Sequence, residues 1–416
     1  MYRHGKEEIE AAAKVLRTGQ WFRFGDKKAG HQGATAKFEA EWAKLMGVPH
    51  SCFVTSGTAA LMCAYAGLQI GPGDEVIIPG FTWIASPHAL LALGAIPVIV
   101  DVDESLMLDP EAVERAITPR TKAIDPVHMS GFMCDLDRLQ KIARQHNLYV
   151  VEDACQCVGG YWKDGRRAGA IGDAGAYSFN WYKVISCGDA GIFIAKKRDV
   201  YERGVIYHDG GTLFWPSGKG MRTPPFAGIN FRGNEILAAI MRVQAARLNG
   251  IVRDLHRVRN GLRKRLAGAP GLVEIPENGA RPAQRAGGSP SGGGTGTGAN
   301  LGLRFENETA ARAFAKAFRE LPKPAKAGAW LPIDSGRHVY WNWESLLQRR
   351  GSYSQAADPF LHPANKDSQA RYAKDMLPRT LEILKRTVLI PINPDWKAQQ
   401  IDGVAQALRE AAKAVP

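Results

Sequence analysis

Short apolar segments alternate with amphipathic ones through the first half of the chain. The amphipathic stretches carry apolar residues at helical spacing, as Phe38, Trp42 and Leu45 do. Such alternation is typical of βαβ units, in which helices cover both faces of a mostly parallel sheet. The pattern predicts strands at SCFVT, EVIIP, PVIVDVD, KAIDPVH and LYVVEDA, and helices from Thr58 to about Leu68, after Trp83, and from Asp137 to Gln145.

The pattern changes near Asn230, where a long helix is predicted to run past residue 260 and to connect two parts of the chain. Residues 276–300 are rich in Gly, Ser and Pro, a composition that cannot support a packed core, so we expect a mobile inserted loop there. LGLRF, ETAARAFAKAFREL and a closing helix after Asp395 predict a small α/β unit. The expected fold is therefore α/β, with a large domain at residues 1–250 and a small domain at residues 251–416.

Composition narrows the class of protein. The 416 residues carry a formal net charge of +13, but Lys and Arg are spread along the whole chain without interleaved aromatics, which favours a solvated basic surface or small anionic substrates over nucleic acid. Six scattered cysteines lack C-x2-C spacing and are interpreted as reduced thiols, without a metal site. No apolar stretch predicts a membrane span, and the first residues read as an amphipathic helix, so we expect a cytoplasmic protein.

Two segments that follow predicted strands are candidates for holding an anion and a planar ring. TSGTAAL places Gly57 at a helix start, where exposed N–H groups form a phosphate cradle, although Ser56 there is equally explained as a helix cap. GFTWIAS places Trp83 at the carboxyl edge of the sheet, where α/β proteins bind ligands. Core packing of Phe81 and Trp83 explains that segment equally well.

Two further segments carry a carboxylate and an amine in apolar surroundings. Asp153 ends the predicted strand in VVEDACQ and needs a partner, which could be a protonated ring nitrogen, magnesium or a helix start. Lys183 is isolated in GDAGAYSFNWYKVISCGDAG, where burial would favour the uncharged, nucleophilic amine; the alternative is a lysine on an exposed turn. A nucleophilic lysine, a carboxylate, a stacking aromatic and a phosphate cradle are together what pyridoxal 5'-phosphate (PLP) requires.

The ordered segments resemble those of the DegT/StrS-type sugar aminotransferases, which are fold-type I PLP-dependent enzymes. The resemblance covers roughly residues 5 to 250 and weakens afterwards to TVLIPINP near the C-terminus. It is carried by GKEEIEAAAKVLRTGQW, SGTAAL, GPGDEVIIPGFTWIAS, DPEAVERAITPRTKAI, VHMSG, VEDACQ, GDAGAYSFNWYK and GINFRGNEILAAI.

The resemblance implies a role for each matching residue. Lys183 would form the Schiff base to PLP and then act as the acid and base. Asp153 would pair with the ring nitrogen, Gln156 would contact the phenolic oxygen, and Trp83 would stack on the ring. The phosphate would be held by Ser56, Gly57, Thr58 and Ser178, and by Asn230 of the neighbouring subunit in a homodimer.

The implied reaction is ping-pong transamination from an amino donor, glutamate or glutamine, to a keto-sugar or similar ketone or aldehyde. A PLP-dependent sugar dehydratase is an alternative, although those relatives replace the lysine with histidine; a non-catalytic PLP-binding regulator is another. The sequence departs from the family at Asp125, where an apolar residue is usual, and in the loop of Asp189. The expected contacts to the acceptor are Lys27, His31, Asp189, His338 and Tyr340.

Overall fold

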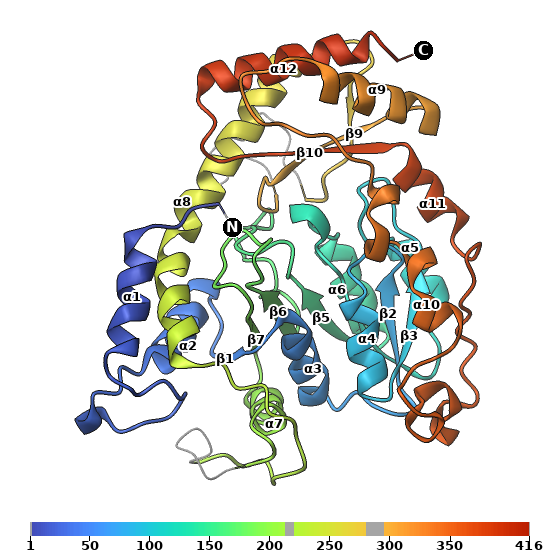
Figure 1. Ribbon diagram of the computed structural model, residues 1–416. Helices are drawn as coiled ribbons and strands as arrows, with labels where there is room; N and C mark the ends of the chain where they lie inside the picture. Colours follow the sequence, from blue (N-terminus) through green and yellow to red (C-terminus); the bar gives the residue numbers. More distant parts are fainter. Residues whose placement is uncertain (1, 213–219, 280–294, 416) are drawn as a thin grey trace.

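The computed structural model describes residues 2–212, 220–279 and 295–415 (Figure 1). Its centre is a seven-stranded sheet in the order β1-β7-β6-β5-β4-β2-β3, in which only β7 runs antiparallel to its neighbours. The predicted mostly parallel sheet is thus confirmed. The strands are β1 (His50–Val54), β2 (Glu75–Pro79), β3 (Ile96–Val100), β4 (Thr121–Ile124), β5 (Tyr149–Asp153), β6 (Ala174–Ser178) and β7 (Gly191–Ala195).

Helices cover the sheet, as its buried strands require. All five residues of β2 and of β6 are buried, which is typical of strands covered on both faces. Helix α3 packs against α4 and α7 in one layer, while α5 packs against α6 in another. The helices of this part are α1 (Lys6–Leu16), α2 (Ala34–Met46), α3 (Gly57–Gly67), α4 (Ala85–Ala92), α5 (Pro110–Ala116), α6 (Leu136–Gln145) and α7 (Arg198–His208).

A second, smaller unit is built on a three-stranded antiparallel sheet in the order β10-β9-β8. Helix α8 (Glu235–Leu266) contacts α1 and α2 beside the large sheet and α12 beside the small one (Figure 1). It runs unbroken through residue 250, so the two units share one helix, and a domain boundary there stays a prediction. The other elements are β8 (Val273–Glu274), β9 (Asn300–Arg304), α9 (Glu308–Glu320), α11 (Pro378–Lys385), β10 (Thr387–Pro391) and α12 (Ala398–Ala412).

The segment between α9 and α11 returns to the large sheet. The carbonyl of Pro97 in β3 accepts a bond from the Tyr372 hydroxyl at 2.7 Å, and the Ser368 hydroxyl bonds Glu75 of β2 at 2.6 Å. Most of this segment is irregular. Its helical turns are η5 (Pro332–Asp334), η6 (Gly336–His338), η7 (Tyr340–Asn342), α10 (Glu344–Leu347), η8 (Gln355–Ala357), η9 (Pro359–Leu361) and η10 (Pro363–Asn365); η1 (Lys27–Ala29) and η2 (Met129–Gly131) occur earlier in the chain.

The Gly-rich stretch differs from its prediction at its C-terminal flank. Residues 280–294, which carry most of the predicted mobile loop, lie outside the described residues. Thr295 and Thr297 are buried, and Gly296 exchanges two backbone hydrogen bonds with Tyr161. For residues 295–300 the prediction of a mobile loop is therefore wrong: backbone pairing, which composition does not reveal, holds this flank in place.

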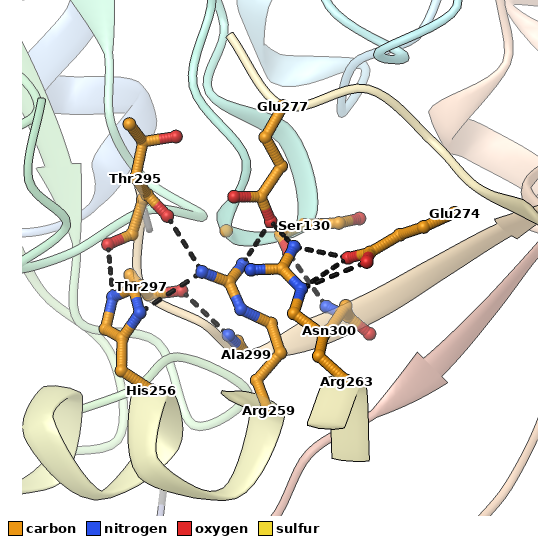
Figure 2. A network of polar contacts seen from close by, with 12 residues as sticks. Ser130, His256, Arg259, Arg263, Glu274, Glu277, Thr295, Thr297, Ala299 and Asn300 are labelled. Atoms are coloured by element: carbon orange, nitrogen blue, oxygen red, sulfur yellow. Dashed lines mark hydrogen bonds and ion pairs between the residues drawn. The ribbon is translucent and has the colours of Figure 1, made fainter. Parts of the chain in front are cut away.

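A buried ionic network supports the same flank (Figure 2). Arg259 of α8 bonds Glu277 at 2.6 Å and the Thr295 carbonyl at 3.3 Å, while Arg263, one turn further along α8, contacts Glu277 at 2.6 Å. The charges of the two arginines outweigh desolvation and lower the pKa of Glu277. The ion pairs to Glu277 and the hydrogen bond to Thr295 therefore tie α8 to both ends of the inserted stretch.

The described residues bear on membrane-spanning segments and on cysteine pairing. Within the three described ranges, no helix combines the length and apolarity needed to cross a membrane. The six cysteines are unpaired thiols, as expected from their spacing.

Candidate functional site

The turns after β1, β5 and β6 meet at one point of the sheet edge. A methyl carbon added at Gly57 would lie 2.8 Å from Ser178 Cβ and 3.0 Å from Cys155 Sγ. Only a glycine lets these three turns approach so closely. The structure thus brings Gly57 and Ser178, two predicted phosphate contacts, directly together.

The start of α3 has donors available for an anion. The Ser56 hydroxyl accepts a bond from the Ala59 N–H at 3.1 Å and so caps the helix, which was the structural alternative for this residue. The amides of Gly57 and Thr58 come first in the helix, where N–H groups have no intrahelical acceptor. Together with the helix dipole they make the α3 start an anion site beside the Ser178 hydroxyl.

Asp153 is a buried carboxylate at the end of β5. It is 4% exposed, and its oxygens accept bonds from the Ser86 hydroxyl at 2.9 Å and from the Cys155 N–H at 3.0 Å. Both donors are neutral. A buried carboxylate held by neutral donors alone favours a cationic partner, which is what a protonated ring nitrogen supplies.

Lys183 lies in the loop between β6 and β7. Its backbone N–H donates to the Asn180 carbonyl at 2.9 Å, and bonds from Phe179 N to Ala190 O and from Trp181 N to Gly188 O close the loop. The side chain is half-buried. Burial and the charge of Asp153 raise the pKa of the Cys155 thiol, and the charge of Lys183 opposes them, so the amine lies within electrostatic reach of Cys155.

Trp83 stands at the rim of this region, 41% exposed. Its ring centroid lies 5.0 Å from that of His338, at an interplanar angle of 54°. His338 reaches the rim because residues 338–340 run along residues 80–82, with Thr82 N bonded to His338 O at 2.9 Å and Tyr340 N to Gly80 O at 3.0 Å. Burial lowers the pKa of His338, the bond with the Ser335 carbonyl opposes this shift and the charge of Lys183 adds to it, so the environment favours the neutral imidazole.

Gln156 is oriented by residues that sequence reasoning did not select. Its side-chain oxygen accepts a bond from Ser130 N at 3.2 Å, which leaves its amide NH2 to donate elsewhere. Ser130 has a positive φ of 54°, and Asn300 of β9 donates to its carbonyl at 2.7 Å. The VHMSG motif marks Ser130 in the sequence, but no pattern pointed to Asn300.

The N-terminal candidates lie elsewhere in this subunit. His31 bonds the Phe22 carbonyl at 3.0 Å and lies 3.6 Å from Glu235, whose carboxylate accepts the first two amides of α2. These contacts place His31 at the start of α8 and not in the Lys183 loop. Lys27, in the short helix η1, is exposed.

Three further candidates have distinct environments. Tyr340 is 1% exposed, and its hydroxyl donates to the Lys374 carbonyl at 2.7 Å and accepts from Leu377 N at 3.1 Å. Because packing and backbone bonds occupy this side chain, we drop Tyr340 from the substrate contacts.

Asp189 is exposed in the Lys183 loop beside Cys187. Asn230 is exposed, on a segment whose next residue accepts a bond from Thr55 N in the β1–α3 turn.

Comparisons with known proteins point to one family. Residues 3–286 match the model of the DegT/DnrJ/EryC1/StrS aminotransferase family. The chain is 38% identical over 245 residues to a 3-amino-5-hydroxybenzoate synthase of Amycolatopsis mediterranei, and 40% identical over 196 residues to an L-glutamine:2-deoxy-scyllo-inosose aminotransferase of Streptoalloteichus tenebrarius. The first match covers 58% of this chain and 61% of that relative, and the second covers 47% of this chain and 46% of that relative. The crystal structure of DesV from S. venezuelae is similar over 98% of this chain and 95% of its own, with 30% identity and a TM-score of 0.73.

Proposed function

Because the chain belongs to the DegT/DnrJ/EryC1/StrS aminotransferase family, we propose that it is a PLP-dependent transaminase with Lys183 as the lysine that bonds the cofactor. The observation that carries the proposal is Asp153, a carboxylate that is 4% exposed and is held among the described residues by two neutral donors. The half-buried Lys183 lies within electrostatic reach of the adjacent Cys155. A protonated pyridine nitrogen supplies the missing positive charge.

The other residues of the region fit the remaining parts of PLP. The free amides at the α3 start and the Ser178 hydroxyl suit a phosphate, and the missing side chain at Gly57 lets Ser178 lie beside the α3 start. The oriented NH2 of Gln156 suits the phenolic oxygen. Trp83 offers a flat face at the rim, where the ring would stack.

These residues divide the chemical work. When bound, PLP withdraws electrons from the substrate carbon that carries the nitrogen. The Lys183 amine would take a proton from that carbon and pass it to the C4' atom of the cofactor, and in the opposite half-reaction it would move a proton from C4' to the carbon of the acceptor. Its half-buried position limits competition from water. Asp153 keeps the ring nitrogen protonated, and Ser86 and Cys155 N hold the carboxylate in one orientation.

The substrates we propose are an amino acid donor, glutamate or glutamine, and a keto-sugar or similar cyclic or polyhydroxylated ketone or aldehyde. One relative, the L-glutamine:2-deoxy-scyllo-inosose aminotransferase, supports this class by its donor and acceptor. His338 and Asp189 are the proposed acceptor contacts. His338 lies at the rim beside Trp83, and Asp189 lies in the same loop as Lys183.

We propose a homodimer in which Asn230, together with Lys27 and His31, completes the neighbouring site. The support is an exposed apolar surface around these residues: Trp21, Phe22, Phe226 and Ile229 are each at least 38% exposed. Their segments are adjacent, because Trp21 O accepts a bond from Glu235 N and Arg232 lies over the Phe22 ring. Exposed apolar groups that cluster in this way mark association surfaces.

A cytoplasmic location also belongs to the proposal, supported by six unpaired thiols.

Borohydride reduction in the presence of PLP tests the assignment of Lys183. Peptide mass spectrometry should find the cofactor on Lys183, and Lys183→Ala should lose this modification and both half-reactions. The matched control is Lys413→Ala, which changes an exposed lysine at the end of α12 and should leave both unchanged. Modification of a different lysine, or full half-reaction rates in Lys183→Ala, would show that the assignment is wrong. Absorbance changes over a panel of amino donors and keto-sugars then identify the substrates.

A further inference from the structure

A buried polar pair lies behind the proposed cofactor site, where the family resemblance leads one to expect an apolar residue. Asp125 directly follows β4, is 0% exposed, and bonds the Ile77 carbonyl of β2 through its backbone N–H at 2.9 Å. The hydroxyl of Tyr65, a fully buried residue of α3, donates to Asp125 Oδ2 at 2.6 Å. Asp125 Oδ1 is buried without a hydrogen-bond partner.

Asp125 shares its surroundings with Asp153. The backbone N–H of Asp153 donates to the carbonyl of Pro126, the residue next to Asp125, at 3.2 Å. β4 and β5 are neighbouring parallel strands, so both carboxyls lie where their carboxyl ends meet. Charge on either group is therefore felt by the other through a poorly screened interior.

Among the described residues, the groups that face Asp125 include no cation. They are the Tyr65 hydroxyl on α3, the Asp153 carboxylate and the Cys155 thiol at the end of β5, and the Cys134 thiol before α6. Two neighbouring buried carboxyls disfavour each other's ionisation, and the cations of the site, the Lys183 amine and the proposed ring nitrogen, act on the side of Asp153 and Cys155. Asp153 has two donors, whereas one oxygen of Asp125 has none, so Asp125 keeps the proton.

The titration of Asp125 agrees with this assignment. Burial and the charge of Asp153 raise the pKa of Asp125 well above its ordinary value, and bonds from Tyr65 and from the Asp153 backbone only partly oppose them. Asp125 therefore keeps its proton to a higher pH than an ordinary aspartic acid does.

Building on the proposed function, we propose that Asp125 is a positioning residue that keeps the PLP ring nitrogen protonated in alkaline solution, acting through Asp153. As the pH rises, Asp125 loses its proton to solvent before the ring nitrogen does. The new negative charge behind Asp153 then stabilises the pyridinium. Tyr65 assists, because its hydroxyl bond stabilises the ionised form of Asp125.

The test follows the ring nitrogen directly in the holoprotein. PLP labelled with 15N is bound to the wild type, to Asp125→Asn and to Tyr65→Phe, and the nitrogen chemical shift is recorded against pH. Asparagine fills the same space and still accepts the Tyr65 bond, but it cannot ionise. In Asp125→Asn the ring nitrogen should lose its proton about one pH unit or more lower than in the wild type, because a nearby charge shifts a titration by that much. Tyr65→Phe should shift it in the same direction by less.

Cofactor content and the free energy of unfolding of each variant report any purely structural damage, which would not move the nitrogen titration. An unchanged or raised nitrogen titration in Asp125→Asn overturns the inference. If that variant does not fold, the infrared spectrum of the wild type decides: a protonated carboxyl band that disappears in alkaline solution supports the inference, and the absence of that band at neutral pH overturns it. Failure of borohydride to modify Lys183 would instead overturn the proposed function.

Discussion

Arg259→Met tests whether the buried ion pairs of α8 stabilise the junction between the two units. The Arg259 side chain is 1% exposed, and its removal leaves the Glu277 carboxylate, at 5% exposure, with Arg263 alone. The His256 ring and the Thr295 carbonyl also lose a donor each. Breaking a buried ion pair costs about 3–5 kcal/mol. Because Arg263 still contacts Glu277, we expect the lower end, about 3 kcal/mol of unfolding free energy.

The assay is urea unfolding followed by fluorescence and circular dichroism, with the slope against urea compared between proteins. Arg312→Met is the matched control: Arg312 also pairs with two carboxylates, of Glu308 and Asp334, but its side chain is 46% exposed. Solvent screening limits its expected loss to about 1 kcal/mol. Adding Glu277→Gln to Arg259→Met should recover part of the loss, since it removes the poorly compensated charge. Equal losses for the two arginine variants, at an unchanged slope, would refute the reasoning.

Two further predictions concern Gly57 and Glu202. Gly57→Ala places a methyl group 2.8 Å from Ser178 Cβ. Overpacking of about 1–3 kcal/mol should weaken PLP binding tenfold or more, as measured by a spectral titration. The control is Gly71→Ala, whose methyl group would lie 3.6 Å from its nearest neighbour and should leave PLP binding unchanged. For Glu202, desolvation is outweighed by bonds from Arg198 and residues 222–223, which lower the pKa from 4.5 to about 2. The stabilisation of the fold by ionised Glu202 is complete above pH 4.5 and is lost as the pH falls towards 2. The wild type should therefore lose more unfolding free energy between pH 7 and pH 3 than Glu202→Gln does. An equal loss in the two proteins would contradict this.

The sequence predicted the large sheet well because its signals are local. Buried strands such as EVIIP, and a cap such as Ser56, are visible in a few consecutive residues. The resemblance also selected Gly57 and Ser178, which the fold brings into contact. Their proposed roles stay predictions until the cofactor is bound and tested.

What the sequence did not predict depends on distant partners. Ser130 is held at positive φ beside Gln156 by Asn300, which lies 170 residues further along the chain. The flank at 295–300 was expected to be mobile because its composition is that of a linker, yet Tyr161 pairs with it. Tyr340 was selected for its aromatic ring, and only packing shows that its hydroxyl is already bonded. Hydrogen bonds between such distant segments leave no periodic pattern.

The hydrogen bonds that attach residues 338–340 to residues 80–82 are formed by main-chain atoms. The side chain of residue 338 can therefore be exchanged without detaching the segment that presents it beside Trp83. If His338 contacts the acceptor as proposed, evolution can in this way revise that contact while the lysine, the carboxylate and the anion cradle stay as they are. The same separation offers protein engineers one short stretch at which to alter substrate choice.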